Sequence, residues 1–235
     1  MKVAIIPARG GSKRIPGKNI KLFAGQPIIA YSIQAALASG LFQRVIVSTD
    51  SEAIAAVSRD YGAETPFVRP SALADDFTTT ADVILHALDW LASHDAPVRH
   101  ACCLYATAPF VQTRFLGEGL EMLERSGAAS VFTVTTYPAP IFRALKQEAD
   151  GRLAMVWPEY ELTRSNDLPE TFHDAGQFYW LDAVRFLADK KIYSPDSRPV
   201  VLPRYLVQDI DTLEDWVTAE AMYEALQVLR KIQKL

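Results

Sequence analysis

The chain has 235 residues, of which 49% are hydrophobic and 22% charged, which is typical of one globular α/β unit with at most a modest appendage. A formal net charge of −4 argues against nucleic acid as the main partner, and the apolar runs are too short for a membrane span. We expect no signal peptide, and the adjacent Cys102 and Cys103 suit a reducing compartment, so the expected location is cytoplasmic.

The first two-thirds of the chain alternates apolar, strand-like runs with helical patterns. We expect strands over 2–6, 44–48, 64–68, 100–105 and 130–135. Between them we expect helices over 28–39, from the cap Asp50 to Tyr61, over 78–93 with Thr78 as cap, and over 114–125 after the cap Thr113. This alternation predicts an α/β fold: a doubly wound, mostly parallel sheet covered on both faces. Neighbouring strand residues point to opposite faces, so the two cysteines are expected to be buried and unbridged.

The alternation breaks between residues 137 and 170. Prolines punctuate this segment, and Asp150-Gly151 between 142–146 and 153–156 is a hairpin signal. We therefore expect an inserted hairpin subdomain at 137–170 within an α/β domain formed by 1–136 and 171–235. Strand character returns over 177–181 and 199–202, and Thr212 is expected to cap a helix that runs to the C-terminus.

The inserted segment is rich in large apolar side chains, which a two-stranded hairpin cannot bury alone. They are Tyr137, Ile141, Phe142, Leu153, Met155, Val156, Trp157 and Tyr160. An exposed apolar surface of this kind usually marks an interface, so we expect a homodimer with Arg164 near the contact. The alternative is that the hairpin folds back on its own domain.

Residues 7–19, here called the N-terminal loop, read PARGGSKRIPGKN and follow the first predicted strand. Gly10 and Gly11 let backbone N–H groups approach an anion closely. Four cations can neutralise that anion: Arg9, Lys13, Arg14 and Lys18. The spacing differs from a Walker A loop and from a dinucleotide-binding loop. We interpret the loop as a triphosphate site, the alternative being a basic surface loop without a ligand.

Two further patterns indicate a nucleotide and a metal. Arg69 follows a predicted strand and precedes a proline, where it can hydrogen-bond a base edge, although an ordinary loop is the alternative. Asp209 and Asp211 stand two residues apart, so in extended backbone both carboxylates share a face and can reach one Mg²⁺ ion. The alternative for this pair is capping of the last helix.

The N-terminal loop resembles the signature of the sugar-acid cytidylyltransferases, and its KRIPGKN part is most similar to the pseudaminic acid enzymes. Residues 104–109 partly resemble the Q-P-T-S-P motif of that family, with Tyr105 in place of glutamine and Ala106 and Ala108 as further departures. Residues 164–176 resemble the segment that meets the sugar, and the ending HDAGQFYW is the pseudaminate-type variant. The resemblance covers nearly the whole chain.

The resemblance implies a role for each matching residue. The implied nucleotide site comprises Ala8, Gly10, Gly11, Ser12, Lys13, Asn19, Arg69, Thr79 and Thr107. The implied acceptor site comprises Arg164, Asp174, Gln177 and Gln208, with Arg164 on the C1 carboxylate of the sugar. The implied catalytic residues are Arg9, Lys18, Asp209 and Asp211, the last two holding Mg²⁺.

The implied reaction is attack of the anomeric hydroxyl of a nine-carbon 2-keto sugar acid on the α-phosphorus of CTP, which gives the CMP-sugar and pyrophosphate. Pseudaminic acid is the expected acceptor, with sialic or legionaminic acid as the alternative and 3-deoxy-octulosonate less favoured. A generic sugar-1-phosphate nucleotidyltransferase is disfavoured by the spelling of the N-terminal loop. A non-catalytic nucleotide-sugar sensor of the same fold is disfavoured by the aspartate pair, because a sensor has little need of a catalytic metal.

Overall fold

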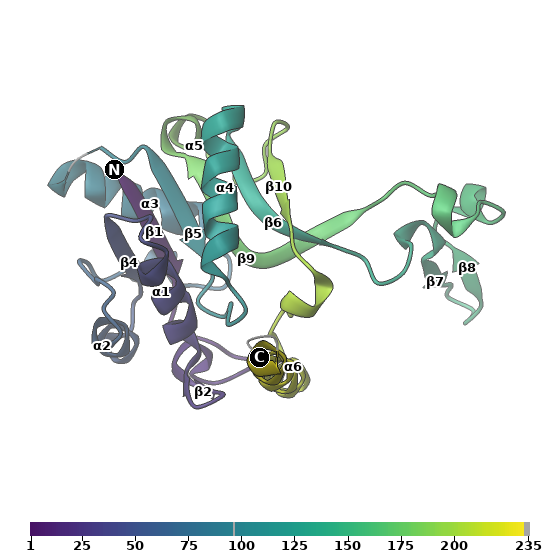
Figure 1. Ribbon diagram of the computed structural model, residues 1–235, viewed down its shortest axis with the longest axis horizontal. Coiled ribbons are helices and arrows are strands. Elements are labelled where there is room, and N and C mark those ends of the chain that lie inside the picture. Colours follow the sequence, from purple (N-terminus) through teal and green to yellow (C-terminus); the bar gives the residue numbers. More distant parts are fainter. Residues whose placement is uncertain (96, 233–235) are drawn as a thin grey trace.

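The computed structural model describes residues 1–95 and 97–232, and its centre is a six-stranded sheet of order β10-β6-β9-β5-β1-β4 (Figure 1). The strands are β1 Lys2–Pro7, β4 Arg44–Ser48, β5 His100–Leu104, β6 Ser130–Thr136, β9 Phe172–Asp182 and β10 Arg198–Val201. β9 runs antiparallel to β5 and β6, whereas the other neighbouring pairs are parallel. The mostly parallel sheet predicted from the alternating pattern is confirmed.

Helices cover both faces of this sheet because its strands are apolar on both sides. Ala4 and Ile6 of β1 pack into a core with α1 (Ile28–Ser39) and α4 (Thr113–Ser126). Val3 and Ile5 pack into a second core with α3 (Thr80–His94) and α5 (Ala183–Asp189). Cys102 and Cys103 are buried, free thiols that lie in opposite cores, as predicted.

The last helix, α6 (Leu213–Ile232), packs through aromatic rings beside a two-stranded ribbon of β2 (Leu22–Phe23) and β3 (Gln26–Pro27). The Phe23 ring lies edge-on to Trp216 and Tyr223, with ring centroids 5.6 Å apart in each pair. Thr212 Oγ1 accepts a hydrogen bond from Asp215 N at 3.2 Å, so the predicted cap of this helix is confirmed. No helix among the described residues combines the length and hydropathy needed to cross a bilayer.

Three predicted helix starts are wrong by one or two residues. α2 (Glu52–Asp60) is capped by Ser51, because the Asp50 carboxylate instead accepts a hydrogen bond from Gly10 N at 2.8 Å. α3 begins after Thr79, which forms a reciprocal capping box with Asp82. Thr113 is the first residue of α4 rather than its cap.

The strand predicted over 64–68 is also wrong. Glu64 forms a single parallel bridge with Ile46, through hydrogen bonds to Val45 and Val47 at 2.8 Å each. Residues 65–68 are described but form no strand. Pro66 explains the early end, because it has no N–H group to continue the ladder beyond Glu64.

Residues 137–171, here called the arm, leave the sheet between β6 and β9 and project from the body (Figure 1). The arm contains the antiparallel strands β7 (Leu145–Gln147) and β8 (Leu153–Met155), joined by a turn in which Gly151 has a φ of 85°. It also contains the single-turn 3₁₀ helices η3 (Ile141–Arg143), η4 (Pro158–Tyr160) and η5 (Ser165–Asp167). Its ends are held together, because Thr136 of β6 pairs with Phe172 of β9.

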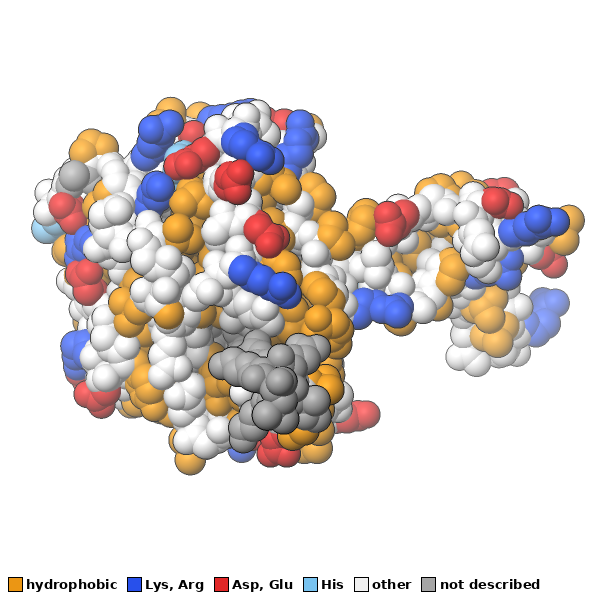
Figure 2. Space-filling view, in the orientation of Figure 1, with side chains coloured by type: hydrophobic (Ala, Val, Ile, Leu, Met, Phe, Trp, Pro, Cys, Tyr) orange, Lys and Arg blue, Asp and Glu red, His pale blue; other side chains and the backbone are white. Residues whose placement is uncertain are grey.

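The arm has a small aromatic centre of its own and an apolar outer surface. The Phe142 ring lies 5.6 Å from Trp157 and 4.7 Å from Tyr160, measured between ring centroids. Leu145, Leu153 and Leu162 are 59%, 67% and 95% exposed. Figure 2 shows the narrow waist that separates the arm from the body. The arm therefore keeps large hydrophobic side chains in solvent when the chain is alone.

Candidate active site

The N-terminal loop follows β1 at the carboxyl edge of the parallel strands, where ligands bind in doubly wound sheets. Three anchors fix its path. Ile15 is buried in the core, Asn19 Nδ2 donates to the Arg9 carbonyl at 3.0 Å, and Gly10 N donates to Asp50. Gly17, with a φ of 63°, lets the chain turn into the short helix η1 (Lys18–Ile20). Contacts within the protein thus hold the path of the loop.

A cavity of about 220 Å³ opens between this loop, the residues after Arg69 and the end of β5. It is lined by Pro7, Arg9, Ser12, Lys18, Asn19, Arg69, Thr78, Thr79, Thr80, Val83, Tyr105, Ala106 and Thr107. The cavity brings together predicted nucleotide residues from three separate stretches of sequence. Ala8, Gly10, Gly11 and Lys13 belong to the same loop but lie outside the lining.

Arg69 is 4% exposed and forms part of the wall of this cavity. Its Nε donates to Ser48 Oγ at 3.1 Å and its Nη2 donates to the Ser48 carbonyl, so β4 holds the guanidinium in one orientation. Burial lowers the pKa of Arg69 to about 10, against an opposing attraction from Asp50. A fixed, desolvated guanidinium of this kind can bind a flat polar group strongly.

Each of the four cations in the N-terminal loop faces a carboxylate. Arg9 Nη1 lies 2.7 Å from Asp76 Oδ1, and Lys13 Nζ pairs with the other oxygen of Asp76. On the opposite side, Asp211 lies 2.9 Å from Arg14 Nη1 and 3.3 Å from Lys18 Nζ. Lys18 also donates to the Ile210 carbonyl at 2.7 Å, which ties the N-terminal loop to the segment before α6.

Asp209 and Asp211 form the carboxylate pair of the sequence motif. Partial desolvation of its carboxyl group, followed by repulsion from Asp211, raises the pKa of Asp209, although the residue is in contact with solvent. Gln208, the residue before the pair, donates through Nε2 to the Asp209 carbonyl at 3.1 Å. Within residues 1–95 and 97–232, no group of three or more His, Cys, Asp or Glu side chains is arranged to hold a metal ion. Two repelling carboxylates nevertheless suit a hard cation that completes its shell with substrate oxygens.

The predicted acceptor residues are divided between β9, the arm and the segment before α6. Gln177 of β9 is buried, and its Nε2 donates to the Leu206 carbonyl at 2.6 Å. Asp174 Oδ2 accepts hydrogen bonds from Tyr179 at 2.6 Å and Tyr193 at 2.5 Å, and burial raises the pKa of both phenols. Arg164 is exposed in the arm, outside the residues that line the cavity.

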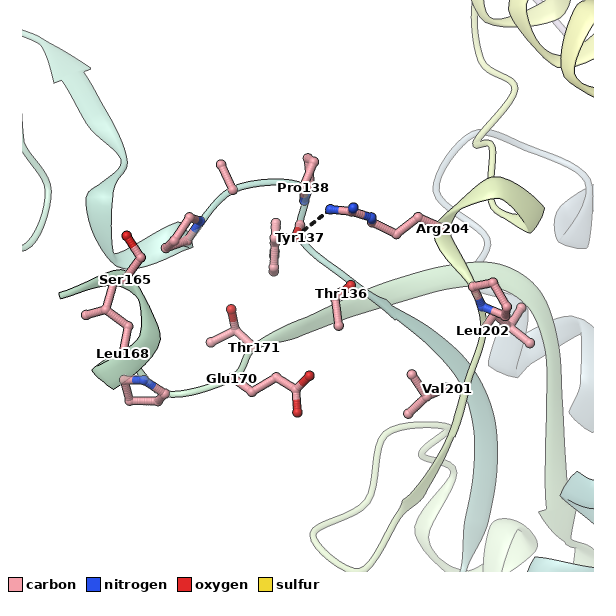
Figure 3. A pocket seen from close by; sticks show the side chains of 14 residues that line it. Thr136, Tyr137, Pro138, Ser165, Leu168, Glu170, Thr171, Val201, Leu202 and Arg204 are labelled. Carbon is pink, nitrogen blue, oxygen red and sulfur yellow. Dashed lines mark hydrogen bonds between the residues drawn. The ribbon is translucent and has the colours of Figure 1, made fainter.

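A larger hollow of about 650 Å³ lies at the base of the arm, and no residue of the N-terminal loop lines it (Figure 3). It is lined by Thr136, Tyr137, Pro138, Ala139, Pro140, Ser165, Leu168, Pro169, Glu170, Thr171, Val201, Leu202, Pro203 and Arg204. Arg204 Nη1 donates across it to the Tyr137 carbonyl at 3.4 Å. Because none of the predicted nucleotide residues lines this hollow, its size does not make it the candidate active site.

Sequence reasoning missed three residues at the site. Asp50 holds Gly10, Asp76 holds Arg9 and Lys13, and Thr80 Oγ1 lies 3.2 Å from the Tyr105 hydroxyl at the cavity wall. Asp50 carried a usable signal, because it comes two residues after β4, a neighbour of β1 in the sheet. The pairing of Asp76 carried no such signal, since its partners lie more than sixty residues away.

Comparisons with known proteins identify the family of this chain. A family model described as Cytidylyltransferase matches residues 3–195. The chain is 41% identical over 94% of its length to a curated pseudaminic acid cytidylyltransferase of Campylobacter jejuni subsp. jejuni, of which it covers 96%. It is 33% identical over 96% of its length to a CMP-N,N'-diacetyllegionaminic acid synthase of Legionella pneumophila, of which it covers 97%.

Solved structures show the same fold. One is a CMP:2-keto-3-deoxy-manno-octonic acid synthetase complexed with CTP, with a TM-score of 0.68 and 15% identity, in a match that covers 95% of this chain and 98% of that one. Another is a 4-diphosphocytidyl-2C-methyl-D-erythritol synthase from Anaerococcus prevotii, with a TM-score of 0.64 and 16% identity, over 95% of this chain and 98% of that one.

Proposed function

The chain belongs to the cytidylyltransferase family, and from this premise we propose that it couples CTP to a nine-carbon 2-keto sugar acid, with pseudaminic acid as the acceptor. The observation that carries the choice of acceptor is the 41% identity to a pseudaminic acid cytidylyltransferase, spread over 94% of the chain. Legionaminic acid is the second candidate, favoured by the 33% identity to the legionaminic acid enzyme.

CTP is proposed to occupy the 220 Å³ cavity with its phosphates on the N-terminal loop. Arg69, oriented by Ser48, binds the cytosine edge, while Arg9 and Lys18 bind phosphate oxygens. Ser12, Asn19, Thr79 and Thr107 border the same space, and Ala8, Gly10, Gly11 and Lys13 shape or extend the loop around it. The support for this arrangement is that cations and polar groups converge at the carboxyl edge of the sheet.

Asp209 and Asp211 would hold a Mg²⁺ ion together with phosphate oxygens of CTP. Desolvation first, and repulsion from Asp211 second, raise the pKa of Asp209. The repulsion supports this assignment, since a cation between the two carboxylates would relieve it. When bound, the metal supplies charge neutralisation at the phosphates and favours ionisation of the attacking hydroxyl.

The protein side chains contribute positioning and charge. The anomeric hydroxyl of the acceptor attacks the α-phosphorus, and the bond from that phosphorus to the bridging oxygen of pyrophosphate breaks. Arg9 and Lys18 stabilise the charge that gathers on the departing pyrophosphate. Lys18 is held by Ile210 and Asp211, so it stands between the phosphates and the carboxylate pair. Alignment of the two substrates supplies much of the rate in displacement at phosphorus.

The acceptor site is proposed to be shared between two copies of the chain. In this organisation, residues 1–136 and 171–235 form the α/β domain, and residues 137–170 dimerise. Gln177, Asp174 and Gln208 belong to the α/β domain, and Arg164 of a second copy approaches the acceptor carboxylate. The support is the exposed apolar surface of the arm and the position of Arg164 in it. Sedimentation equilibrium at micromolar protein tests this: a single species of monomer mass would refute it.

The activity is tested by incubating the protein with CTP, Mg²⁺ and a panel of nonulosonic acids, and measuring pyrophosphate. We expect the highest kcat/KM with pseudaminic acid and strong preference for CTP over UTP, ATP and GTP. A higher kcat/KM with legionaminic or sialic acid would reassign the acceptor. Release of no pyrophosphate with any of these acids would contradict the proposed reaction and favour a nucleotide-sugar sensor.

A further inference from the structure

Asp76 occupies an unexpected place for a carboxylate. Its two oxygens contact Arg9 and Lys13, the cations that the proposed function assigns to phosphate. These contacts, to Lys13 first and to Arg9 second, hold the pKa of Asp76 below its usual range, so it carries a full negative charge at neutral pH. An anionic side chain therefore sits where part of an anionic ligand must bind.

The segment that carries Asp76 is an ordered turn, formed by residues 75–78. Asp75 Oδ1 accepts hydrogen bonds from Phe77 N at 3.0 Å and from Thr78 N at 2.7 Å, and Thr78 Oγ1 donates to it at 2.6 Å. The Asp75 carbonyl accepts from Arg9 Nη1 at 2.6 Å. The Asp75 carboxylate thus accepts hydrogen bonds within its own turn, and the Asp76 carboxylate is the one that contacts the cations.

Asp76 lies at the outer rim of the cavity that is proposed to hold CTP. Arg9 lines the cavity, whereas Lys13 and Asp76 do not, and the Lys13 side chain is 79% exposed. In the binding mode proposed above, with the base on Arg69, the phosphates of CTP farthest from the base would lie at this rim. Asp211, which pairs with the other two cations of the loop, has Asp209 beside it and fits a metal. Asp75, the neighbour of Asp76, instead accepts hydrogen bonds within its own turn.

We propose that Asp76 is an intramolecular competitor for the outer phosphates of CTP and for pyrophosphate, and so a residue that promotes pyrophosphate release. Phosphate oxygens and the Asp76 carboxylate use the same N–H groups of Arg9 and Lys13. Ligand binding therefore requires these ion pairs to open, and the apparent affinity falls by the fraction of molecules in which they are open. After transfer, Asp76 recaptures the cations as pyrophosphate leaves. This inference rests on the proposed function.

The test is calorimetric titration of Asp76→Asn and wild-type protein with CTP, pyrophosphate and CMP in the presence of Mg²⁺. Asparagine keeps the shape of the side chain and removes its charge. We expect CTP and pyrophosphate to bind about three- to tenfold more tightly to the variant, which is the scale of one or two exposed ion pairs. CMP, which has no outer phosphates, should bind within about twofold of wild type. Asp76→Glu restores the charge and Asp60→Asn removes an exposed charge on α2, so both should resemble wild type.

Two results would overturn the inference. Unchanged or weaker binding of CTP and pyrophosphate by Asp76→Asn would mean that Asp76 positions Arg9 and Lys13 for phosphate instead of competing with it. Equal tightening of CMP would mean that the effect is not confined to the outer phosphates. A wild-type protein that binds no CTP would contradict the proposed function instead, so the titration of wild-type protein with CTP is done first.

Discussion

A substitution of Arg69 should change the binding of CTP without changing the rate of the chemical step. It is buried and oriented by Ser48, and its proposed partner is the base, which does not change during the reaction. Arg69→Ala should therefore remove binding that is equal in the ground and transition states. We expect the KM for CTP to rise about 10- to 100-fold with kcat little changed, the scale of hydrogen bonds to a charged group. The CTP/UTP preference should fall in parallel. Steady-state kinetics with both nucleotides measure this.

The matched control for this prediction is Arg59→Ala, which removes an exposed arginine paired with Glu52 on α2. Its kinetic constants should stay near wild type. An Arg69→Ala enzyme with unchanged CTP/UTP preference would show that another group reads the base.

Asp209 gives a prediction about stability and pH. A raised pKa means that the folded state holds the proton more tightly than the unfolded state, so this site favours folding below the ordinary Asp pKa and loses that contribution as pH rises. Asp209→Asn should therefore raise the Tm at pH 7 in EDTA, by no more than about 2 °C because solvent screens the pair. The gain should shrink toward zero at pH 4, and turnover should be lost. Thermal melts monitored by circular dichroism at pH 7 and pH 4 measure the Tm, and pyrophosphate release measures the turnover.

Mg²⁺ provides the companion measurement. It should raise the Tm of wild type and leave that of Asp209→Asn nearly unchanged, because the variant lacks one of the two proposed ligands. A similar Mg²⁺ response in both proteins would place the metal elsewhere.

At the scale of elements, the packing of α4 on the sheet depends on Gly119. A Cβ at this position would lie 2.9 Å from Trp180 Cδ1 and 3.0 Å from Phe178 Cε2, and both rings are fully buried. Gly119→Ala should cost about 1–3 kcal/mol of unfolding free energy through overpacking. Gly117→Ala in the same helix meets no atom within 4 Å and should stabilise by about 0.5–1 kcal/mol through helix propensity. Urea unfolding of both variants measures the contrast, and equal effects would contradict it.

Elements with a strong local pattern were predictable, whereas the bounds and contacts that depend on distant pairing were not. α1 has its predicted bounds, because its apolar pattern and the αL residue Gly40 are both local signals. β9 was predicted only over 177–181, yet it starts at Phe172, since its first residues are strand through pairing with β6. The same holds at the site. The cations of the N-terminal loop were visible in sequence, but Asp50, 40 residues away from its partner Gly10, was not assigned to them.

At the scale of the whole molecule, the proposed shared site predicts complementation between inactive variants. Arg164→Ala should lack the arm's contribution and Asp211→Ala the metal ligand, so each homodimer should be nearly inactive. Refolding the two as a 1:1 mixture makes half of the dimers mixed, each with one complete site, and should restore about a quarter of wild-type turnover. Pyrophosphate release measures this.

The control mixture combines Asp209→Ala with Asp211→Ala, which damage the same half of the site and should restore nothing. Absence of recovery in the Arg164→Ala mixture, with dimers present by sedimentation, would confine the acceptor site to one chain.

The pairing of Thr136 with Phe172 also makes the arm a tethered loop in the polymer sense. Because the sheet already holds its two ends together, the closure entropy of the arm changes slowly with contour length, by about 0.6 kcal/mol for each doubling. Insertions, deletions or wholesale exchange between Thr136 and Phe172 therefore leave the register of β6 and β9 and the folding free energy of the body nearly unchanged. As far as folding is concerned, the arm can therefore be lengthened, shortened or exchanged without disturbing the body, and the constraints on its sequence come from the proposed dimer contact and from Arg164.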